Sequence, residues 1–397
     1  MAGADRAWEA RKCTGRSRKG LEFRFQRPAP RFNPAVSRES RITVLHYTGS
    51  RRDDGGVHAV IRNIAADAHM DAVLGVSPGY GATKEPSLPV WCGPAVADEM
   101  IGAGNLWPTL QVAWKIRSWL RAAPRRVYHG HSRAGMLVAL WLHFLGEDRA
   151  VVSVHCYGRH LWVYRLAHGL LGQRFLWLSP AMKRHYGLPD LSWSGCMPNG
   201  LNASLSAVMR RGPGADGVLR LGGAGALVRW KRWDLVLEAL ARLPASAKVR
   251  FMHIGGALDS AESRACEQDL RAQTERLGLR DRVEWRGWQP SSAGLLAEVD
   301  AVVVPSDGEP FSMIALEAMF AGVPVIATRG GGPEDFIVEG VNGWLVPQGD
   351  AAALAARIEA LLQPAAWNGL RVMPEHLRKF SMPETLAGRW AAIYASL

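Results

Sequence analysis

Two glutamates in the second half of the chain have the spacing to hold the two ends of a diphosphate-containing ligand. Glu309 lies just before a helix that is expected to begin near Phe311 or Ser312, and Glu317 lies inside that helix. The free backbone N–H groups of Phe311, Ser312 and Met313, together with the positive end of the helix dipole, suit a phosphate or diphosphate. Eight residues of helix span about 12 Å, which matches the separation of the two sugars in a nucleotide-sugar diphosphate.

The elements that would position these glutamates are short β-branched runs alternating with helical patterns, at the spacing of βα units. In the first half we expect strands over residues 42–46, 72–76, 126–130, 151–155 and 175–178, with helices over 57–66 and 135–144. In the second half we expect strands over 218–221, 249–254, 282–285, 301–304, 324–327 and 344–346, with helices over 234–242, 261–277 and 313–321. Parallel strands with crossover helices form a doubly wound sheet.

Two such sheets in succession predict an α/β protein with two Rossmann-like domains that face each other across a cleft, where ligands bind beyond the carboxyl ends of the strands. The segment RRGPGADG at 210–217 reads as a linker. The expected organisation is a basic, solvated arm (1–41), an N-terminal acceptor domain (42–209), a C-terminal donor domain (210–378) and a C-terminal helix (379–397) that packs back toward the N-terminal domain.

The stretch VDAVVVPSDGEPFSMIALEAMFAGVPVIATRGGGPEDFIVEGVNGWLVPQGD, residues 299–350, carries a family resemblance. It resembles the E-x7-E segment of retaining glycosyltransferase family 4 enzymes, which have the GT-B fold. The likeness continues through residues 322–327 and 332–334 to Asn342 and Gly343. The resemblance implies that Glu309 orients the sugar of a nucleotide-sugar donor and that Glu317 binds its ribose, while residues 311–313 hold the diphosphate.

Landmarks in the first half agree with this resemblance in order and spacing. His131 lies at a strand end, and the resemblance implies that it sits beside the anomeric carbon, although a strand-end histidine taken alone is more often structural. His155 ends the next strand and is a candidate of the same type. Gly56, in a Gly-Gly pair, lets backbone approach the donor or acceptor, and Asn199 shapes the crossing between domains.

The expected diphosphate clamp departs from the family pattern. Lys231 is present, but Ala226 stands where the family usually carries an arginine. Losing one of two cations near a leaving diphosphate weakens stabilisation of its developing charge. Arg232 or Arg229 can supply the missing charge, because guanidinium groups bind phosphate well.

Neither a metal nor another cofactor is expected. Asp53-Asp54 and Asp307-Gly308-Glu309 are the nearest approaches to a carboxylate pair, and no His/Cys/Asp cluster has ligand spacing along the sequence. The five cysteines contain no C-x-x-C pair, which favours a reducing cytoplasm over a disulfide framework.

More than half of the net positive charge lies in the N-terminal segment. Its net charge is +12, and residues 1–41 alone hold eleven Lys and Arg against four Asp and Glu. Residues 107–126 read as an amphipathic helix with tryptophans and cations, the composition of a helix that lies on a membrane surface, although many surface helices share it. The inner, cytoplasmic face of an anionic membrane is therefore a possible partner. Nucleic acid is not expected as a partner, because the globular part lacks the basic aromatic stripe of a nucleic-acid binder.

The function expected from these features is metal-independent transfer of a sugar, with retention, from a nucleotide-sugar to a hydroxyl of a glycan or lipid-linked acceptor in surface polysaccharide or glycolipid synthesis. Ala226 motivates an alternative, an inactive homologue that acts as a binding partner or scaffold. A nucleic-acid binder and a related epimerase or phosphorylase are further alternatives.

Overall fold

The computed structural model describes residues 41–51, 56–66, 70–81, 88–96, 103–201, 213–214, 216–370, 377 and 383–397. The chain divides into two compact units. Unit 1 runs to Trp177 and includes the segment from Leu386 to Leu397, and unit 2 runs from Leu178 to Thr385. This division falls earlier in the chain than the boundary expected at residue 210. The expected arm lies outside the described residues except for Arg41, and so do four of the eight residues of the expected linker.

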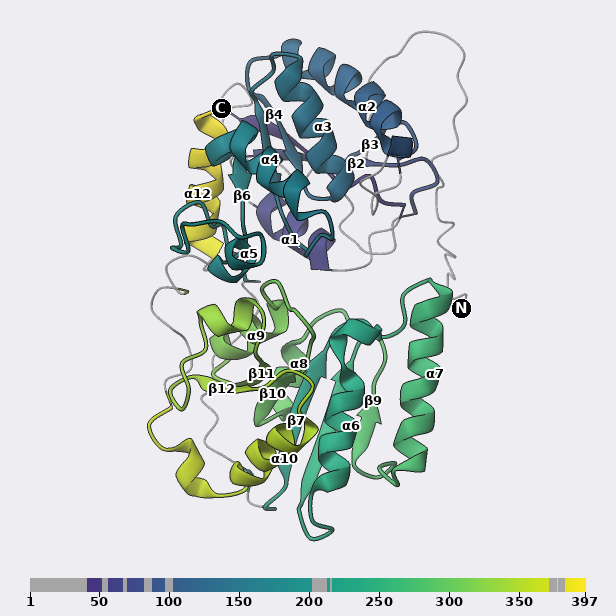
Figure 1. Ribbon diagram of the computed structural model, residues 1–397, viewed down its shortest axis with the longest axis vertical. Helices are drawn as coiled ribbons and strands as arrows, with labels where there is room; N and C mark the ends of the chain where they lie inside the picture. Colours follow the sequence, from purple (N-terminus) through teal and green to yellow (C-terminus); the bar gives the residue numbers. More distant parts are fainter. Residues whose placement is uncertain are drawn as a thin grey trace, which may run out of the picture. The chain divides into compact units, whose positions relative to one another are not determined.

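Unit 1 is built on a parallel six-stranded sheet with the strand order β3-β2-β1-β4-β5-β6 (Figure 1). Its strands are β1 (Ile42–Tyr47), β2 (Met70–Val76), β3 (Val90–Cys92), β4 (Arg126–Gly130), β5 (Ala150–Ser153) and β6 (Phe175–Leu176). Its helices are α1 (Gly56–Ala65), α2 (Ala103–Arg121), α3 (Arg133–Phe144), α4 (Leu161–Leu171) and most of α12 (Pro383–Ala395).

Unit 2 has a second parallel six-stranded sheet, in the order β12-β11-β10-β7-β8-β9. Its strands are β7 (Leu219–Ala224), β8 (Val249–Ile254), β9 (Val283–Trp285), β10 (Ala301–Val304), β11 (Val325–Thr328) and β12 (Gly343–Val346). Its helices are α5 (Pro180–His185), α6 (Trp233–Arg242), α7 (Ala261–Arg276), α8 (Ala293–Glu298), α9 (Met313–Phe320) and α10 (Ala351–Ala360).

Both sheets have the Rossmann strand order when the strands of each unit are numbered from its own first strand. In each, the order reverses between the first and fourth strands, which are β1 and β4 in unit 1 and β7 and β10 in unit 2. Ligands of such sheets bind beyond the carboxyl ends of the strands at this switch point. The predicted α/β fold class with two doubly wound sheets is thereby confirmed.

The central strands are apolar because both faces of a parallel sheet are covered. All residues of β10 (AVVV) and β11 (VIAT) are buried. Ala301, Val303 and Ile326 belong to a core cluster of unit 2 that includes Trp233, Phe251 and Trp344. In unit 1, glycine lets helix α3 approach the sheet closely, because a Cβ on Gly130 would lie 2.7 Å from the carbonyl oxygen of Gly135. The tight contact places the end of β4 directly beside the start of α3.

Strand β3 is absent from the strands expected from the sequence. It is a three-residue strand at the edge of the sheet, too short to show an alternating pattern. Helix α2 begins at Ala103, before the expected start at Trp107, and it contains Pro108. Pro108 is the sixth residue of this helix, beyond the first turn, so it removes one N–H group from the hydrogen-bond ladder of the helix.

Candidate functional site

In unit 2, the side chains of Glu309 and Lys231 are paired at the carboxyl edge of the sheet. Glu309 follows β10, and its Oε2 accepts hydrogen bonds from Lys231 Nζ, at a very short distance, and from Ser306 Oγ at 3.2 Å. Lys231 ends the short helix η3 (Arg229–Lys231), and its ammonium also lies 4.3 Å from the ring centre of Trp230. Lys231 and Glu309, which were both expected from the sequence to bind the nucleotide-sugar donor, are therefore in direct contact.

The loop that carries Glu309 is held by close backbone packing. Cβ atoms on Gly331 and Gly332 would lie 2.2 Å from the carbonyl oxygen of Glu309 and 2.3 Å from that of Pro310, and the Gly332 N–H donates to the Glu309 carbonyl at 2.6 Å. Only glycine fits at such a distance. The short helix η4 (Gly332–Asp335) thereby fixes the position of the Glu309 backbone.

Residues 179–184 buttress the same loop, which sequence reasoning did not foresee. Ser179 Oγ donates to the Pro310 carbonyl at 3.1 Å. The Asp335 carboxylate accepts from the Ala181 N–H at 2.5 Å and from Arg184 at 2.7 Å. These partners lie more than 130 residues apart in the chain, so no local signal marks them.

Helix α9 begins at Met313, close to the expected start. Its N-cap is Ser312, whose Oγ accepts from the Ala315 N–H at 3.4 Å. Ser312 has a φ of 71°, which is costly for a residue with a Cβ and is found mostly at functional sites. Phe311 is buried and packs against Phe336, with 5.5 Å between ring centres.

Glu317 lies inside α9 as expected, but it does not join Glu309. Its Oε2 accepts a hydrogen bond of 2.6 Å from Ser292 Oγ, at the residue that precedes α8. Burial raises the pKa of Glu317, and the bond from Ser292 opposes that rise. The Ser292 contact was missed, because Ser292 precedes α8 and lies 25 residues before Glu317 in the chain.

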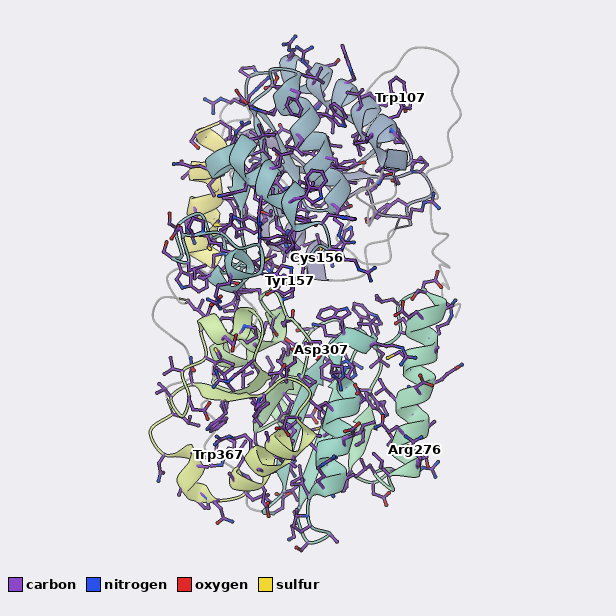
Figure 2. The ribbon with its side chains drawn as sticks, viewed as in Figure 1. Trp107, Cys156, Tyr157, Arg276, Asp307 and Trp367 are labelled. Carbon is purple, nitrogen blue, oxygen red and sulfur yellow. The ribbon has the colours of Figure 1, made fainter. Side chains whose placement is uncertain are left out.

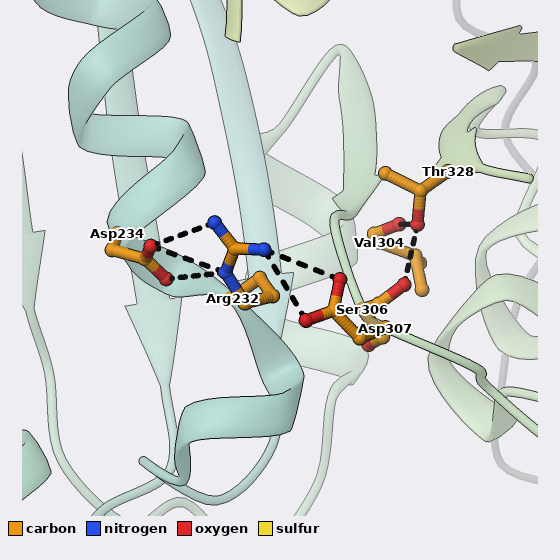
Figure 3. A network of polar contacts seen from close by, with 6 residues as sticks. All are labelled: Arg232, Asp234, Val304, Ser306, Asp307 and Thr328. Atoms are coloured by element: carbon orange, nitrogen blue, oxygen red, sulfur yellow. Dashed lines mark hydrogen bonds and ion pairs between the residues drawn. The ribbon is translucent and has the colours of Figure 1, made fainter. Parts of the chain in front are cut away.

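Arg232 is engaged by carboxylates on two sides (Figure 3). Its guanidinium donates to Asp234 at 3.1–3.2 Å and to Asp307 at 3.2–3.3 Å, and the Asp234 bonds raise its pKa. Arg229 is likewise paired with Asp269 at 3.1 Å. Arg232 and Arg229, which were expected to replace the arginine missing at position 226, are therefore both ion-paired in this structure.

The loop between β10 and Glu309 is anchored to the neighbouring strand. Thr328, at the end of β11, donates its hydroxyl hydrogen bond to the Ser306 carbonyl at 2.6 Å (Figure 3). Asp307 then follows Ser306, and Figure 2 labels its position in unit 2. The anchor fixes the turn from which Asp307 and Glu309 reach their cationic partners.

In unit 1, the switch point carries a cluster of histidines. His46 of β1 and His129 of β4 are register partners, and His131 follows two residues later, so the three imidazoles share one side of the sheet. His46 Nδ1 lies 2.9 Å from His131 Nε2, and His131 Nδ1 lies 3.0 Å from His155 Nε2. The predicted residues His131 and His155 are therefore in contact.

His129 is held from the sheet and from the last helix. Its Nε2 lies 2.8 Å from Ser153 Oγ, and its Nδ1 lies 2.8 Å from the Tyr394 hydroxyl of α12. Burial raises the pKa of Tyr394, so it stays a phenol. From the sequence, His129 was expected only to lie on the same side of its strand as His131, and His46 was not singled out, because the contact of His46 with His129 depends on the order of the strands.

All four imidazoles of this cluster are held neutral. Burial lowers the pKa of His46 to about 3 and that of His155 to about 4. Burial, with further lowering by neighbouring histidines, also places the pKa of His129 and His131 well below the usual value. Each neutral ring thus carries one N–H group, and its second nitrogen has a lone pair that can accept a hydrogen bond or bind a metal.

The remaining predicted residues take no part in these contacts. Gly56 begins α1 and is exposed, with open space where a side chain would be. Asn199 is buried in unit 2. Asp53 and Asp54 lie outside the described residues.

The comparisons with known proteins support the family resemblance. Residues 219–364 match the model of the family "Glycosyl transferases group 1". The lipopolysaccharide core biosynthesis glycosyltransferase LpsE of Rhizobium meliloti is 36% identical over 147 residues, which are 37% of this chain and 39% of that protein. A D-inositol 3-phosphate glycosyltransferase of Mycobacterium marinum is 34% identical over 167 residues, which are 41% of this chain and 35% of that protein.

The match therefore spans well under half the length of these curated relatives. A solved structure gives wider coverage. The crystal structure of Anabaena Alr3699/HepE in complex with UDP superimposes with a TM-score of 0.68 at 21% identity, over 90% of this chain and 100% of that one. The chain thus has the GT-B fold, and its residues 219–364 are similar to the family of glycosyl transferases group 1.

Proposed function

We propose that the protein transfers a sugar from a nucleotide-diphosphate sugar to a hydroxyl group of an acceptor. The observation that carries this proposal is the Lys231–Glu309 pair at the switch point of the unit 2 sheet, beside the start of α9. A cation and the free N–H groups of a helix start suit a diphosphate, and a carboxylate suits sugar hydroxyls. Complexes of Anabaena HepE with UDP and with UDP-glucose support a donor of this class.

Each residue has a defined part in the proposed transfer. Lys231 and the backbone of residues 311–313 hold the diphosphate, Glu309 orients the transferred sugar, and Glu317 binds the ribose once it leaves Ser292. His131 lies beside the anomeric carbon. Retention follows from attack on the same face as the leaving group through an oxocarbenium-like state, with the leaving phosphate taking the acceptor proton. No divalent ion is needed at the diphosphate.

The acceptor we propose is a glycan or lipid-linked hydroxyl at an anionic membrane surface. Helix α2 exposes Leu106, Trp107 and Trp114, and Trp107 projects from it in Figure 2. Arg117 lies 5.9 Å from the ring centre of Trp114. Exposed tryptophans beside cations are typical of helices that lie in a lipid interface. Among the described helices, none has the length and hydropathy to cross a membrane.

Turnover of labelled UDP-, GDP- and ADP-sugars tests the proposal. We expect release of nucleoside diphosphate from one donor, and a loss of about 10²–10³-fold in Glu309→Gln. The matched control is Glu359→Gln, because Glu359 is exposed on α10. Turnover that is unchanged in Glu309→Gln contradicts the assigned site.

One observation favours a second candidate, a catalytically weak homologue that acts as a binding partner. Ala226 removes a cation, and Arg229 and Arg232 are both occupied by carboxylates. This candidate predicts that nucleoside diphosphates bind but that no donor turns over with any acceptor. Detectable transfer that is lost in Glu309→Gln rules it out.

A further inference from the structure

Three buried imidazoles converge at the carboxyl edge of the unit 1 sheet. One nitrogen each from His46, His129 and His131 lies within 4.8 Å of the others. Their ring centres are 3.8 to 5.4 Å apart, and all three residues are at most 3% exposed. The grouping follows from the fold, because His46 and His129 are register partners on adjacent strands and His131 is two residues farther on the same side.

We propose that His46, His129 and His131 bind one Zn²⁺ ion. Neutral imidazole is a preferred ligand of Zn²⁺, and three histidines with a fourth position for water or another ligand form an established zinc geometry. This departs from the expectation that the chain has no metal site. That expectation rested on ligand spacing along the sequence, whereas these ligands come from two strands that are distant in the chain.

The distances suit the ion after small side-chain movements. Tetrahedral Zn²⁺ with Zn–N bonds near 2.0–2.1 Å holds its ligand nitrogens about 3.4 Å apart. His46 Nδ1 and His131 Nε2 now lie 2.9 Å apart, as a hydrogen-bonded pair. When the metal binds both nitrogens, the shared proton moves to the other nitrogen of the ring that carries it, His46 Nε2 or His131 Nδ1. No net proton is gained or lost.

The groups around the three rings complete the site. Metal-bound histidines usually use their other ring nitrogen in a hydrogen bond that fixes the ring. His131 Nδ1 already contacts His155 Nε2 at 3.0 Å. His129 has Tyr394 on one nitrogen and Ser153 on the other, so one of the two remains as a partner when the other nitrogen binds the metal.

The ion would join two strands of unit 1 that are far apart in the sequence, one of which also contacts α12 in this structure. His46 belongs to β1, His129 to β4, and Tyr394 reaches His129 from α12. All three ligands belong to unit 1. The proposed transfer also uses His131, so the test of the ion measures metal binding and uses no turnover.

The test is metal binding by the full chain after removal of metals with a chelator. Zn²⁺ is added both to the folded protein and during refolding, because the three imidazoles are buried. We expect one Zn²⁺ per chain by titration calorimetry and by elemental analysis, with a rise in melting temperature. X-ray absorption of the wild-type complex should show imidazole nitrogens at about 2.0–2.1 Å.

Variants locate the ion. His46→Asn and His131→Asn should weaken binding by more than the roughly 10–100-fold typical of an outer partner, and His155→Gln should fall within that range. His160→Asn removes an exposed histidine, and His253→Asn removes a buried one in unit 2. Both controls should bind like the wild type.

Three results would overturn the proposal: no binding under either condition, binding that is unchanged in His46→Asn, or an absorption spectrum with oxygen ligands only. The first leaves the cluster as a hydrogen-bonded chain of imidazoles. The second result would place the ion at a site other than the histidine cluster, on the surface of the protein. The X-ray absorption measurement needs no variant, so it decides the ligand set even where His46→Asn fails to fold.

Discussion

Lys231 and Glu309 pair with each other at the carboxyl edge of the unit 2 sheet, although one is expected to hold the diphosphate of a donor and the other its sugar. Their side chains are only 16% and 10% exposed. A largely desolvated pair is costly to break by removing one partner, because the other charge is left uncompensated. A bound donor must therefore offer new partners to both groups.

Removing the charge of Glu309 should separate nucleotide binding from transfer. In Glu309→Gln, Lys231 loses its anionic partner and is available to a diphosphate, so UDP or the preferred nucleoside diphosphate should bind roughly tenfold more tightly. Transfer should fall, because no carboxylate orients the sugar. Calorimetry with the nucleoside diphosphate measures the first effect, and Glu359→Gln serves as the control. Weaker nucleotide binding in Glu309→Gln argues against the exchange of partners.

Restoring an arginine at position 226 should strengthen the diphosphate site. Arg229 is already paired with Asp269, and Arg232 with Asp234 and Asp307. Because these three carboxylates already have partners, they do not compete with the diphosphate for a new guanidinium at position 226. One added charged hydrogen bond corresponds to about tenfold in affinity. We expect Ala226→Arg to lower the dissociation constant of the nucleoside diphosphate, with Ala226→Gln as the uncharged control. Equal affinities for both variants would show that position 226 does not face the diphosphate.

A methyl group at position 332 should disturb the loop that carries Glu309. The new Cβ would lie 2.3 Å from the Pro310 carbonyl oxygen and 2.7 Å from the Phe311 Cα, and both are backbone atoms. We expect Gly332→Ala to lower the free energy of unfolding by about 1–3 kcal/mol, as overpacking does. Gly294→Ala, in α8 with open space around it, should be neutral or stabilising. Urea denaturation compares the two, and equal stabilities would disprove the close packing.

The histidine cluster should make the protein sensitive to acid. In the unfolded chain the imidazoles take up protons below pH 6.5, whereas in the fold the pKa of His46 is about 3 and that of His155 about 4. The unfolded state therefore binds more protons as the pH falls from 6.5 toward 4, and stability declines in that window. Each histidine contributes at most about 1.4 kcal/mol per pH unit.

Urea midpoints at pH 7 and pH 5, measured in chelator, check this decline. His155→Gln should reduce the difference between the two midpoints, whereas His185→Asn, which removes an exposed histidine outside the cluster, should leave it as it is. A midpoint that does not change between these pH values would show that the cluster takes up protons without unfolding.

Helix α2 should bring the protein to anionic vesicles. Trp107 and Trp114 are 66% and 53% exposed, and they lie seven residues apart, on one face of the helix. We expect the protein to sediment with vesicles that contain phosphatidylglycerol and less with phosphatidylcholine alone. The double variant Trp107→Ala/Trp114→Ala should lose most of this binding. Trp288→Ala, which removes an exposed tryptophan of unit 2, should keep it.

The sequence was enough to predict the fold class and the start of α9, because both depend on local patterns. Apolar runs such as AVVV in β10 mark buried parallel strands, and the residues around Ser312 mark a helix start. Lys231 and Glu309 were singled out by the motifs in which they lie. Their pairing was not foreseen, because it joins residues 78 positions apart.

The contacts that escaped prediction depend on strand order and on distant segments. His46 and His129 meet only because β1 and β4 are neighbours, and a list of expected strands does not give that order. Asp335 reaches Ala181 across 154 positions. Strand β3 escaped because three residues at a sheet edge carry no periodicity.

The bond between Tyr394 and His129 bears on the order in which the chain is completed during synthesis. His129 lies at the heart of unit 1, but its partner on α12 is translated only after every residue of unit 2. The contact between α12 and His129 can therefore form only after unit 2 has been synthesised. Unit 2 has its own residues in one uninterrupted run, so it is the first of the two that can be finished.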